Sequence, residues 1–207
     1  MSDDHDHYFT ASPASDAQLR ERSVTLAGQQ VTVWSAGGVF SPDHVDKGTA
    51  ILLDNVEELP QTGTFLDLGS GWGPIALTMA ALRPEAAVYG VDVNERAVDL
   101  LQRNAQRLGH AQVEALTPDA VPSETTFDVI WSNPPIRIGK AALHELLETW
   151  LPRIAPGGRS EMVVSKNLGS DSLQKWLADR FPDMVVERTA SEKSFRILVV
   201  RNPAATS

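Results

Sequence analysis

Asp67-Leu68-Gly69-Ser70-Gly71-Trp72-Gly73 connects a short apolar run, Thr64–Leu68, to an apolar run of helical period, Pro74–Leu82. Glycines allow the backbone to turn sharply and to approach a ligand closely, and the helix that follows offers unpaired N–H groups. A strand, a glycine-rich turn and a helix in this order predict the first unit of a parallel α/β sheet. A tight turn without a ligand remains the alternative.

The chain continues from this unit as an alternation of strand-like and helix-like segments, which predicts a Rossmann-like mixed α/β sheet with helices on both faces. Seven strands are expected after residue 63, and the last two form an antiparallel pair because only polar residues join them. The expected strands cover residues 64–68, 88–93, 112–116, 127–132, 159–165, 184–189 and 195–201, and the expected helices cover residues 74–82, 96–108, 141–154 and 172–181.

A short β appendage precedes the sheet. Two β-branched runs, residues 24–26 and 31–34, flank Ala27-Gly28-Gln29-Gln30, which is a hairpin signal. Apolar residues at helical spacing then predict a helix over residues 49–59 that ends at Pro60.

Length and composition indicate one globular domain. The 207 residues are 42% hydrophobic and 22% charged, which is ordinary globular composition and excludes collagen-like and wholly disordered chains. We expect one domain over residues 21–201, whose appendage covers residues 21–60, between flexible tails at residues 1–20 and 202–207.

Cysteine content, the N-terminus and charge narrow the function classes. With no cysteine, disulfides, thiolate metal sites and cysteine nucleophiles are excluded. The N-terminus is polar and acidic rather than a signal peptide, and no apolar run is long enough to span a membrane, so a soluble cytoplasmic protein is expected. The net charge of −9 argues against a nucleic-acid partner. However, residues 137–207 carry 11 basic and 8 acidic side chains.

The glycine spacing indicates the cofactor. Gly69, Gly71 and Gly73 follow G-x-G-x-G, whereas a dinucleotide fingerprint would need a glycine where Pro74 stands. This difference disfavours a nicotinamide cofactor. Together with the acid Asp67, the spacing suits a cofactor with an amino-acid moiety, such as S-adenosylmethionine, whose product after methyl transfer is S-adenosylhomocysteine.

Polar residues at the ends of the next two strands complete the predicted cofactor site. Asp92 ends the second strand, where its carboxylate can bridge two ribose hydroxyls. Asn94 is the expected N-cap of the following helix, which would leave Asp92 free, and we count it with the cofactor residues. Asp119, in the turn after the third strand, would reach the adenine edge, although an Asp beside a proline is also common in turns for local reasons.

Ser132-Asn133-Pro134-Pro135-Ile136 at the end of the fourth strand predicts the catalytic loop. The prolines fix the backbone and remove two donors, so carbonyls project from a stiff frame. An aromatic amine is a poor nucleophile because its lone pair is delocalised. If Asn133 Oδ1 and the Pro134 carbonyl accept its two N–H bonds, the nitrogen can pyramidalise and attack a sulfonium methyl, without a base acting first.

These motifs resemble those of S-adenosylmethionine-dependent methyltransferases that act on exocyclic amines. The match covers the nucleotide-binding turn at 67–73, the ribose acid Asp92 and the N-P-P-[FYI] loop at 133–136, and the resemblance extends over about residues 20–201. A narrower resemblance is to the small-domain methyltransferases typified by ribosomal RNA small-subunit guanine-N2 methyltransferases. It rests on Gly38-Val39-Phe40-Ser41, Asp46-Lys47-Gly48-Thr49, Arg137-Ile138-Gly139-Lys140 and Lys193-Ser194-Phe195-Arg196.

The resemblance implies a fold, a site and a partner. The family has a seven-stranded Rossmann-like sheet whose last strand is inserted antiparallel. Its motifs imply cofactor contacts at Gly69, Gly71, Asp92 and Asp119 and a catalytic role for Asn133. They also imply a ribosomal RNA or small-ribosomal-subunit partner and no metal, and they leave the oligomeric state open.

Two departures from the family pattern concern the substrate. Many members carry Phe or Tyr where Ile136 stands, and that ring stacks on the flipped base. Phe40 and Trp72 are the candidates to stack instead. We also expect no second, degenerate methyltransferase-like domain of the kind that larger relatives carry. RNA binding would then depend on the basic residues Arg137, Lys140, Lys166, Lys193 and Arg196.

The leading hypothesis is therefore methylation of guanine N2 in small-subunit ribosomal RNA. The same chemistry on a glutamine amide or on adenine N6 is the first alternative, and a non-catalytic assembly factor that binds S-adenosylmethionine or RNA is the second. The acidic net charge favours a protein substrate, whereas the β appendage and the basic C-terminal segment favour RNA.

Overall fold

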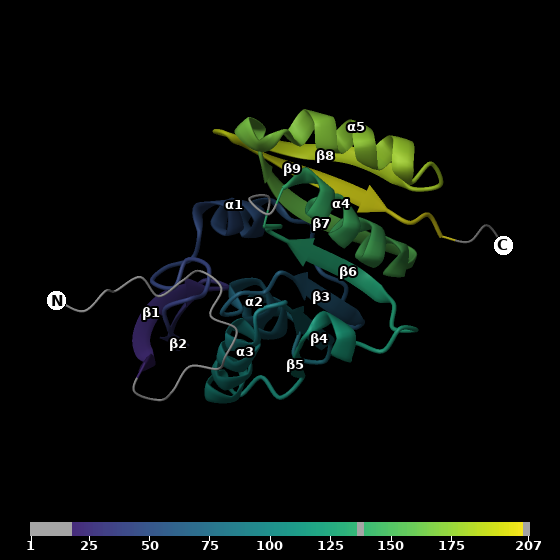
Figure 1. Cartoon of the computed structure of the whole chain (residues 1–207). Helices are drawn as coiled ribbons and strands as arrows, with labels where there is room; N and C mark the ends of the chain where they lie inside the picture. The colour runs from purple at the N-terminus through teal and green to yellow at the C-terminus, as the bar shows by residue number, and fades with distance from the viewer. Residues whose placement is uncertain (1–17, 136–138, 205–207) are drawn as a thin grey trace.

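The computed structural model describes residues 18–135 and 139–204, which form a seven-stranded sheet with helices on both faces and a separate hairpin (Figure 1). The sheet strands are β3 (Thr64–Leu68), β4 (Ala87–Val91), β5 (Val113–Leu116), β6 (Phe127–Ser132), β7 (Ile154–Ser165), β8 (Val185–Glu192) and β9 (Phe195–Arg201). Their order is β5-β4-β3-β6-β7-β9-β8. β3 to β7 are parallel, and β9 is antiparallel to both of its neighbours. The predicted Rossmann-like fold and its antiparallel final pair are confirmed.

The two faces of the sheet bury two separate apolar cores, because successive side chains of a strand point to opposite faces. In β3, for example, Phe65 faces the first core and Leu66 the second. Helices α1, α2 and α3 and the hairpin cover the first core, and α4 and α5 cover the second (Figure 1). The bounds are β1 (Arg20–Leu26), β2 (Gln29–Ser35), α1 (Lys47–Asn55), α2 (Pro74–Leu82), α3 (Glu95–Leu108), α4 (Lys140–Trp150) and α5 (Ser170–Arg180).

Helix α3 shows how local sequence fixes an element beside the site. Asn94 Oδ1 accepts a hydrogen bond of 3.0 Å from the Arg96 N–H and so caps the helix, as predicted. Gly109, with φ of 75°, ends it in the left-handed region. Leu100 and Leu101 are fully buried on its inner face, and burial of each leucine contributes roughly 1.5–3 kcal/mol.

The appendage differs in detail from the prediction. The hairpin turn is only Ala27-Gly28, with φ of 49° and 75°, rather than residues 27–30. Such positive values in a two-residue loop match the right-handed twist of the strands. Helix α1 covers Lys47–Asn55 instead of 49–59, because Asp46 caps its start and the backbone at Val56 is already extended.

Other boundaries also differ from the prediction: β4 ends at Val91 rather than at residue 93, and β8 covers Val185–Glu192 rather than 184–189. Two further differences lie near prolines. Helix α4 ends at Trp150, and Leu151–Arg153 forms a separate 3₁₀ turn, because the proline inside it cannot donate to a continuing α-helix. Strand β7 begins at Ile154 rather than at Arg159, with a register irregularity against β6. In the described ranges, no helix combines the length and apolar character needed to cross a membrane.

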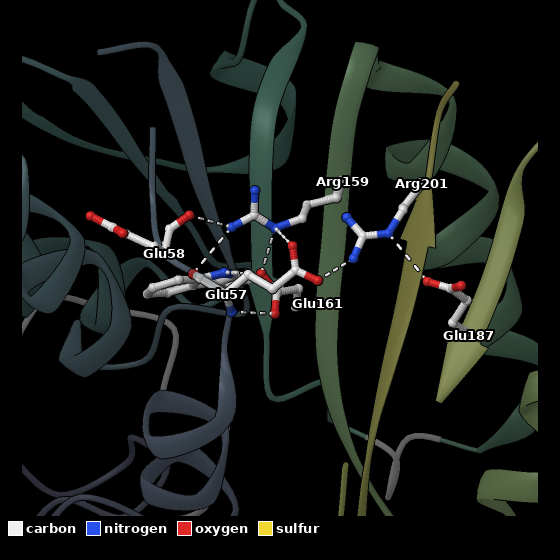
Figure 2. Close-up of polar contacts among 7 residues, drawn as sticks. Glu57, Glu58, Arg159, Glu161, Glu187 and Arg201 are labelled. Atoms are coloured by element: carbon white, nitrogen blue, oxygen red, sulfur yellow. Dashed lines mark hydrogen bonds and ion pairs between the residues drawn. The ribbon is translucent and has the colours of Figure 1, made fainter. Parts of the chain in front are cut away.

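The segment after α1 is anchored on the sheet by a buried carboxylate (Figure 2). Glu161 is fully buried and accepts hydrogen bonds from Trp131 Nε1 at 3.1 Å, Arg159 Nε at 2.7 Å and the Glu57 N–H at 3.0 Å. Arg159 Nη2 also donates to the carbonyl oxygens of Glu57 and Glu58, at 3.1 and 2.9 Å. These hydrogen bonds hold the chain after α1 against the sheet, so the helix ends before Pro60. They also fix the position of the C-terminal end of α1.

Glu161→Gln is expected to lower the free energy of unfolding by about 1–3 kcal/mol. The amide removes the negative charge that accepts three hydrogen bonds, and its NH₂ group would face the N–H donors of Trp131, Arg159 and Glu57. Urea unfolding measures this loss. Glu187→Gln is the matched control, since Glu187 pairs with Arg201 at 3.2 Å on the exposed side of the network (Figure 2), and its effect should stay within about 0.5 kcal/mol. Equal losses in the two variants would contradict a special role for Glu161.

Candidate active site

The glycine turn lies against the carboxyl end of β4. The N–H groups of Gly69 and Ser70 donate to the Val91 carbonyl oxygen at 2.8 and 3.0 Å. Gly73 has φ of 100°, and a Cβ there would lie 2.3 Å from Leu101 Cδ1, so α3 can pack this closely only against glycine. The predicted turn is therefore held between β4 and α3.

Asp67, at the carboxyl end of β3, lies directly beneath this turn. Its side chain is fully buried, and Oδ2 accepts a hydrogen bond of 2.9 Å from the Ala76 N–H. Burial raises the pKa of Asp67 to about 8; the Ala76 hydrogen bond opposes this shift, and the Asp92 carboxylate adds to it. Among the described residues, Asp67 Oδ1 and the buried Ser70 Oγ have no hydrogen-bond partner.

Asp92 is not free, which corrects the prediction. Its Oδ2 accepts from the Gly71 N–H and its Oδ1 from the Asn94 N–H, each at 2.9 Å. Burial raises the pKa of Asp92, and these backbone hydrogen bonds partly oppose the shift. Each carboxylate oxygen can accept more than one hydrogen bond, so the side chain fastens the turn and still has acceptor capacity for hydroxyls.

Asp119 follows the third strand of the predicted cofactor site, β5. It is exposed in the 3₁₀ turn Pro118–Ala120 after β5. Hydrogen bonds from Thr117 and from its own backbone lower the pKa of Asp119, which matches the local role of Asp in a turn. Among the described residues, no hydrogen bond joins Asp119 to the glycine turn, and its adenine contact stays a prediction.

Asn133, directly after β6, is oriented by two residues at the start of α1. Its Nδ2 donates to Asp46 Oδ2 and to Thr49 Oγ1, each at 3.0 Å. Because a carboxylate accepts only, the amide NH₂ must face Asp46. In residues 18–135 and 139–204, no donor contacts Asn133 Oδ1, so this oxygen is available to a substrate.

The residues that follow β6, Asn133-Pro134-Pro135, form a proline corner. This corner lies beside the glycine turn because β3 and β6 are neighbours in the sheet. The Ser132 hydroxyl donates to the Leu68 carbonyl oxygen at 2.7 Å. A Cβ at Gly69 would lie 3.8 Å from Pro135 Cδ. Pro134 is buried and Pro135 exposed. The two motifs, more than 60 residues apart in the chain, thus meet at one edge of the sheet.

A small, partly open hollow lies between these segments. Its walls come from three parts of the chain: the segment before α1, the glycine turn with the start of α2, and the corner after β6. The lining residues are Phe40, Ser41, Asp46, Thr49, Gly69, Ser70, Gly71, Trp72, Pro74, Ile75 and Asn133. Of the predicted site residues, the structure brings Phe40, Gly69, Gly71 and Asn133 together here.

The segment before α1 is tied to the cofactor turn by side-chain donors. Trp72 Nε1 donates to the Ser41 carbonyl oxygen at 3.1 Å, and Asn94 Nδ2 donates to the Gly38 carbonyl oxygen at 2.8 Å. The two candidate stacking rings therefore differ in position. Trp72 is only 2% exposed, whereas Phe40 is 44% exposed on the wall of the hollow.

Sequence reasoning gave no role to Asp46 and Thr49. The available signal was an Asp three residues before a Thr at the start of an apolar helical run, which predicts an N-cap. That role is present, since Asp46 Oδ2 accepts from the Gly48 and Thr49 N–H groups at 2.7 and 3.4 Å. The contact with Asn133 joins positions 87 apart in the chain, and no local pattern indicates it.

The other predicted substrate residues do not line the hollow. Lys140 is exposed at the first position of α4. Lys166 is exposed after β7, where its N–H donates to the Ser194 carbonyl oxygen at 2.7 Å. Ile136 and Arg137 lie outside the described residues.

The chain is similar to proteins of one family. The family model described as Methyltransferase small domain matches residues 30–199. The Bacillus subtilis protein YbxB, described as uncharacterized, is 34% identical over 184 residues, which cover 87% of this chain and 92% of YbxB. Ribosomal RNA small subunit methyltransferase C of Pseudoalteromonas translucida is 35% identical over 130 residues, which cover 62% of this chain and 38% of that protein.

Solved structures share the fold. The Thermus thermophilus 16S rRNA N2 G1207 methyltransferase RsmC, in complex with AdoMet and guanosine, matches with a TM-score of 0.74 and 25% identity. That match covers 92% of this chain and 52% of RsmC. A methyltransferase from Pyrococcus furiosus, at 22% identity and a TM-score of 0.58 over 74% of this chain and 81% of its own, supports the fold alone. The chain spans about half the length, or less, of the ribosomal RNA methyltransferases that it matches.

Proposed function

This chain belongs to the methyltransferase small domain family of S-adenosylmethionine-dependent enzymes, and we propose that it methylates the exocyclic N2 amine of a guanine in small-subunit ribosomal RNA. The observation that carries the proposal is the Asn133 amide, which Asp46 and Thr49 hold with its oxygen available in a hollow beside the glycine turn. The names of the relatives support the same reaction, since RsmC is an N2 methyltransferase of 16S rRNA.

The residues present fit S-adenosylmethionine. Buried Asp67 Oδ1 and Ser70 Oγ have no partner in the described part of the chain, and a Cβ at Gly71 would meet no atom within 4 Å. We assign the amino-acid end of the cofactor to Asp67 and the turn, and the ribose to Asp92. When bound, the cofactor supplies a methyl group on a sulfonium. Contacts of Gly73, Asn94 and Asp119 with it remain predictions.

The chain's own contribution is to hold the amine. Asn133 Oδ1 and the Pro134 carbonyl oxygen accept its two N–H bonds, which localises the nitrogen lone pair toward the methyl group. As the N–C bond forms, the bond between the methyl group and the sulfur would break and leave a neutral thioether. Positive charge develops on the nitrogen, and these preoriented oxygens stabilise it. The product ammonium then loses one N–H proton to solvent water, which restores a neutral amine. The roles of Pro135 and Ile136 in the catalytic loop remain predictions.

Methyl transfer from labelled S-adenosylmethionine to small ribosomal subunits and to their naked RNA tests the proposal. We expect label in RNA, recovered as N2-methylguanosine on nucleoside analysis, and much less label with Asn133→Ala. Label recovered as N6-methyladenosine, or in a protein glutamine, would support the alternative substrates. Cofactor binding without transfer to any of these acceptors would support a non-catalytic assembly factor.

Phe40→Ala is expected to raise KM for the RNA about 10-fold or more, because stacking of a base on an aromatic ring contributes roughly 1–3 kcal/mol. The change in kcat should be smaller, since Phe40 does not contact the amine in this proposal. Leu82→Ala is the matched control, because Leu82 is similarly exposed, at 43%, and lies on α2 outside the lining of the hollow. An unchanged KM in Phe40→Ala would contradict the stacking role. That Arg137, Lys140 and Lys166 bind the substrate remains a prediction.

A further inference from the structure

Within the described part of the chain, Asp46 accepts hydrogen bonds at only one of its two carboxylate oxygens. The Gly48 N–H at 2.7 Å, the Thr49 N–H at 3.4 Å and Asn133 Nδ2 at 3.0 Å all donate to Oδ2. In the two described ranges, no donor contacts Oδ1. Asp46 is half-buried and lines the hollow next to Asn133. The site therefore has an acceptor-only group beside the group that would hold the amine.

The proximity of these two side chains depends on the absence of a side chain between them. A Cβ at Gly48 would lie 3.0 Å from Asp46 Oδ2, 3.3 Å from Asn133 Nδ2 and 3.3 Å from Phe195 Cε1. All three distances are tighter than ordinary van der Waals contact. Gly48 thus lets the Asp46 carboxylate and the Asn133 amide share one wall of the hollow.

A carboxylate oxygen next to Asn133 can discriminate between amine-bearing groups, because it favours those whose atom adjacent to the amine is a hydrogen-bond donor. Ionised carboxylates accept hydrogen bonds and donate none. In guanine the atom next to the N2 amine is N1, which carries a hydrogen. In adenine and cytosine the ring nitrogen next to the amine is an acceptor, and in a glutamine amide the neighbour is a carbonyl oxygen. Only guanine offers Asp46 a donor at the position beside the amine.

We infer that Asp46 Oδ1 accepts the N1–H of the target guanine while Asn133 Oδ1 accepts from its N2 amine, so that Asp46 selects guanine over other amines. The inference rests on the proposed function and adds a specificity-determining residue to it. Asp46 then has two roles at its two oxygens: Oδ2 caps α1 and orients Asn133, and Oδ1 reads the Watson–Crick edge of a base turned into the site.

The test compares guanine with 2-aminopurine at the mapped target position of a synthetic RNA. 2-Aminopurine keeps the exocyclic 2-amine but has no hydrogen on N1. For the wild-type protein, kcat/KM should be about 10- to 100-fold lower for 2-aminopurine, because a hydrogen bond to a charged group is worth roughly 1.5–3 kcal/mol. In Asp46→Asn the difference should shrink to about 3-fold or reverse, since the amide can donate to the bare N1.

The comparison of two substrates separates a change in base selectivity from a loss of folded protein. Asn is a good N-cap and keeps one acceptor oxygen for the Gly48 N–H and for Asn133, and the ratio between two substrates is insensitive to a general loss of active protein. Asp43→Asn is the matched control, because Asp43 is an exposed acid of the same segment that pairs with Arg22 at 2.7 Å. This control should keep the wild-type ratio.

Two results would overturn the inference and leave the proposed function intact: equal wild-type rates on the two bases, or an Asp46→Asn ratio equal to that of the wild type. A wild-type protein that transfers no methyl group to guanine N2 of any small-subunit RNA would overturn the proposed function and the inference with it.

Discussion

Asn133→Ala is expected to reduce kcat for methyl transfer about 10²- to 10³-fold, the loss typical when one preorganised group that stabilises transition-state charge is removed. The alanine cannot accept an N–H bond from the amine, so the lone pair stays delocalised and the developing charge loses one of its two oxygens. The Pro134 carbonyl remains, so some transfer persists. Single-turnover kinetics with saturating RNA and cofactor measures the change, because it isolates the chemical step from binding and product release.

Binding of S-adenosylhomocysteine, measured by calorimetry, should change less than about threefold in Asn133→Ala, since the cofactor in this proposal rests on the glycine turn. Asn202→Ala is the matched control, because its Nδ2 donates at 2.8 Å to the carbonyl oxygen of Ile154, at the opposite end of β7 from the site. Transfer by Asn202→Ala should equal that of the wild type. Full activity in Asn133→Ala would contradict the assignment of the proline corner as catalytic.

The fold could be predicted from the sequence wherever local signals mark both ends of an element. Thr64–Leu68, Pro74–Leu82 and Phe127–Ser132 have the predicted bounds, since glycine, proline or polar residues flank each of them. The end of α1 could not be predicted. It depends on Glu161, a buried carboxylate on β7 that accepts the Glu57 N–H, and hydrophobic spacing carries no information about such a long-range contact.

The candidate site was predictable in its parts but not in its connections. The order of strands placed the glycine turn and Asn133 at one edge of the sheet, because carboxyl ends of parallel strands meet there. The pairing of Asn133 with Asp46 was not predictable, since it requires the start of α1 to lie over β6. The same limit explains Asp92, whose bond to the Gly71 N–H closes a turn 21 residues earlier in the chain.

Asp67→Asn is expected to remove a pH-dependent loss of stability between about pH 4 and pH 8. In the folded protein, burial raises the pKa of Asp67 from 3.8 to about 8. Between these values the folded state holds a proton that the unfolded state has lost, so the free energy of unfolding falls as pH rises, by at most about 1.4 kcal/mol per pH unit. The stabilising effect of the protonated form is complete below pH 3.8 and lost above about pH 8. Asparagine carries no titrating proton and contributes no such slope.

Urea unfolding of the wild type and Asp67→Asn at pH 5, 6, 7 and 8 measures the effect as the difference between the two proteins, because the other titrating groups are common to both. The amide oxygen can still accept from the Ala76 N–H, so the hydrogen bond at 2.9 Å is retained. The variant should therefore gain on the wild type as pH rises, by several kcal/mol over this range. Asp179→Asn, at an exposed position of α5, should follow the wild type at every pH. Parallel curves for the wild type and Asp67→Asn would mean that Asp67 is already ionised in the folded protein at pH 5, against the effect of its full burial.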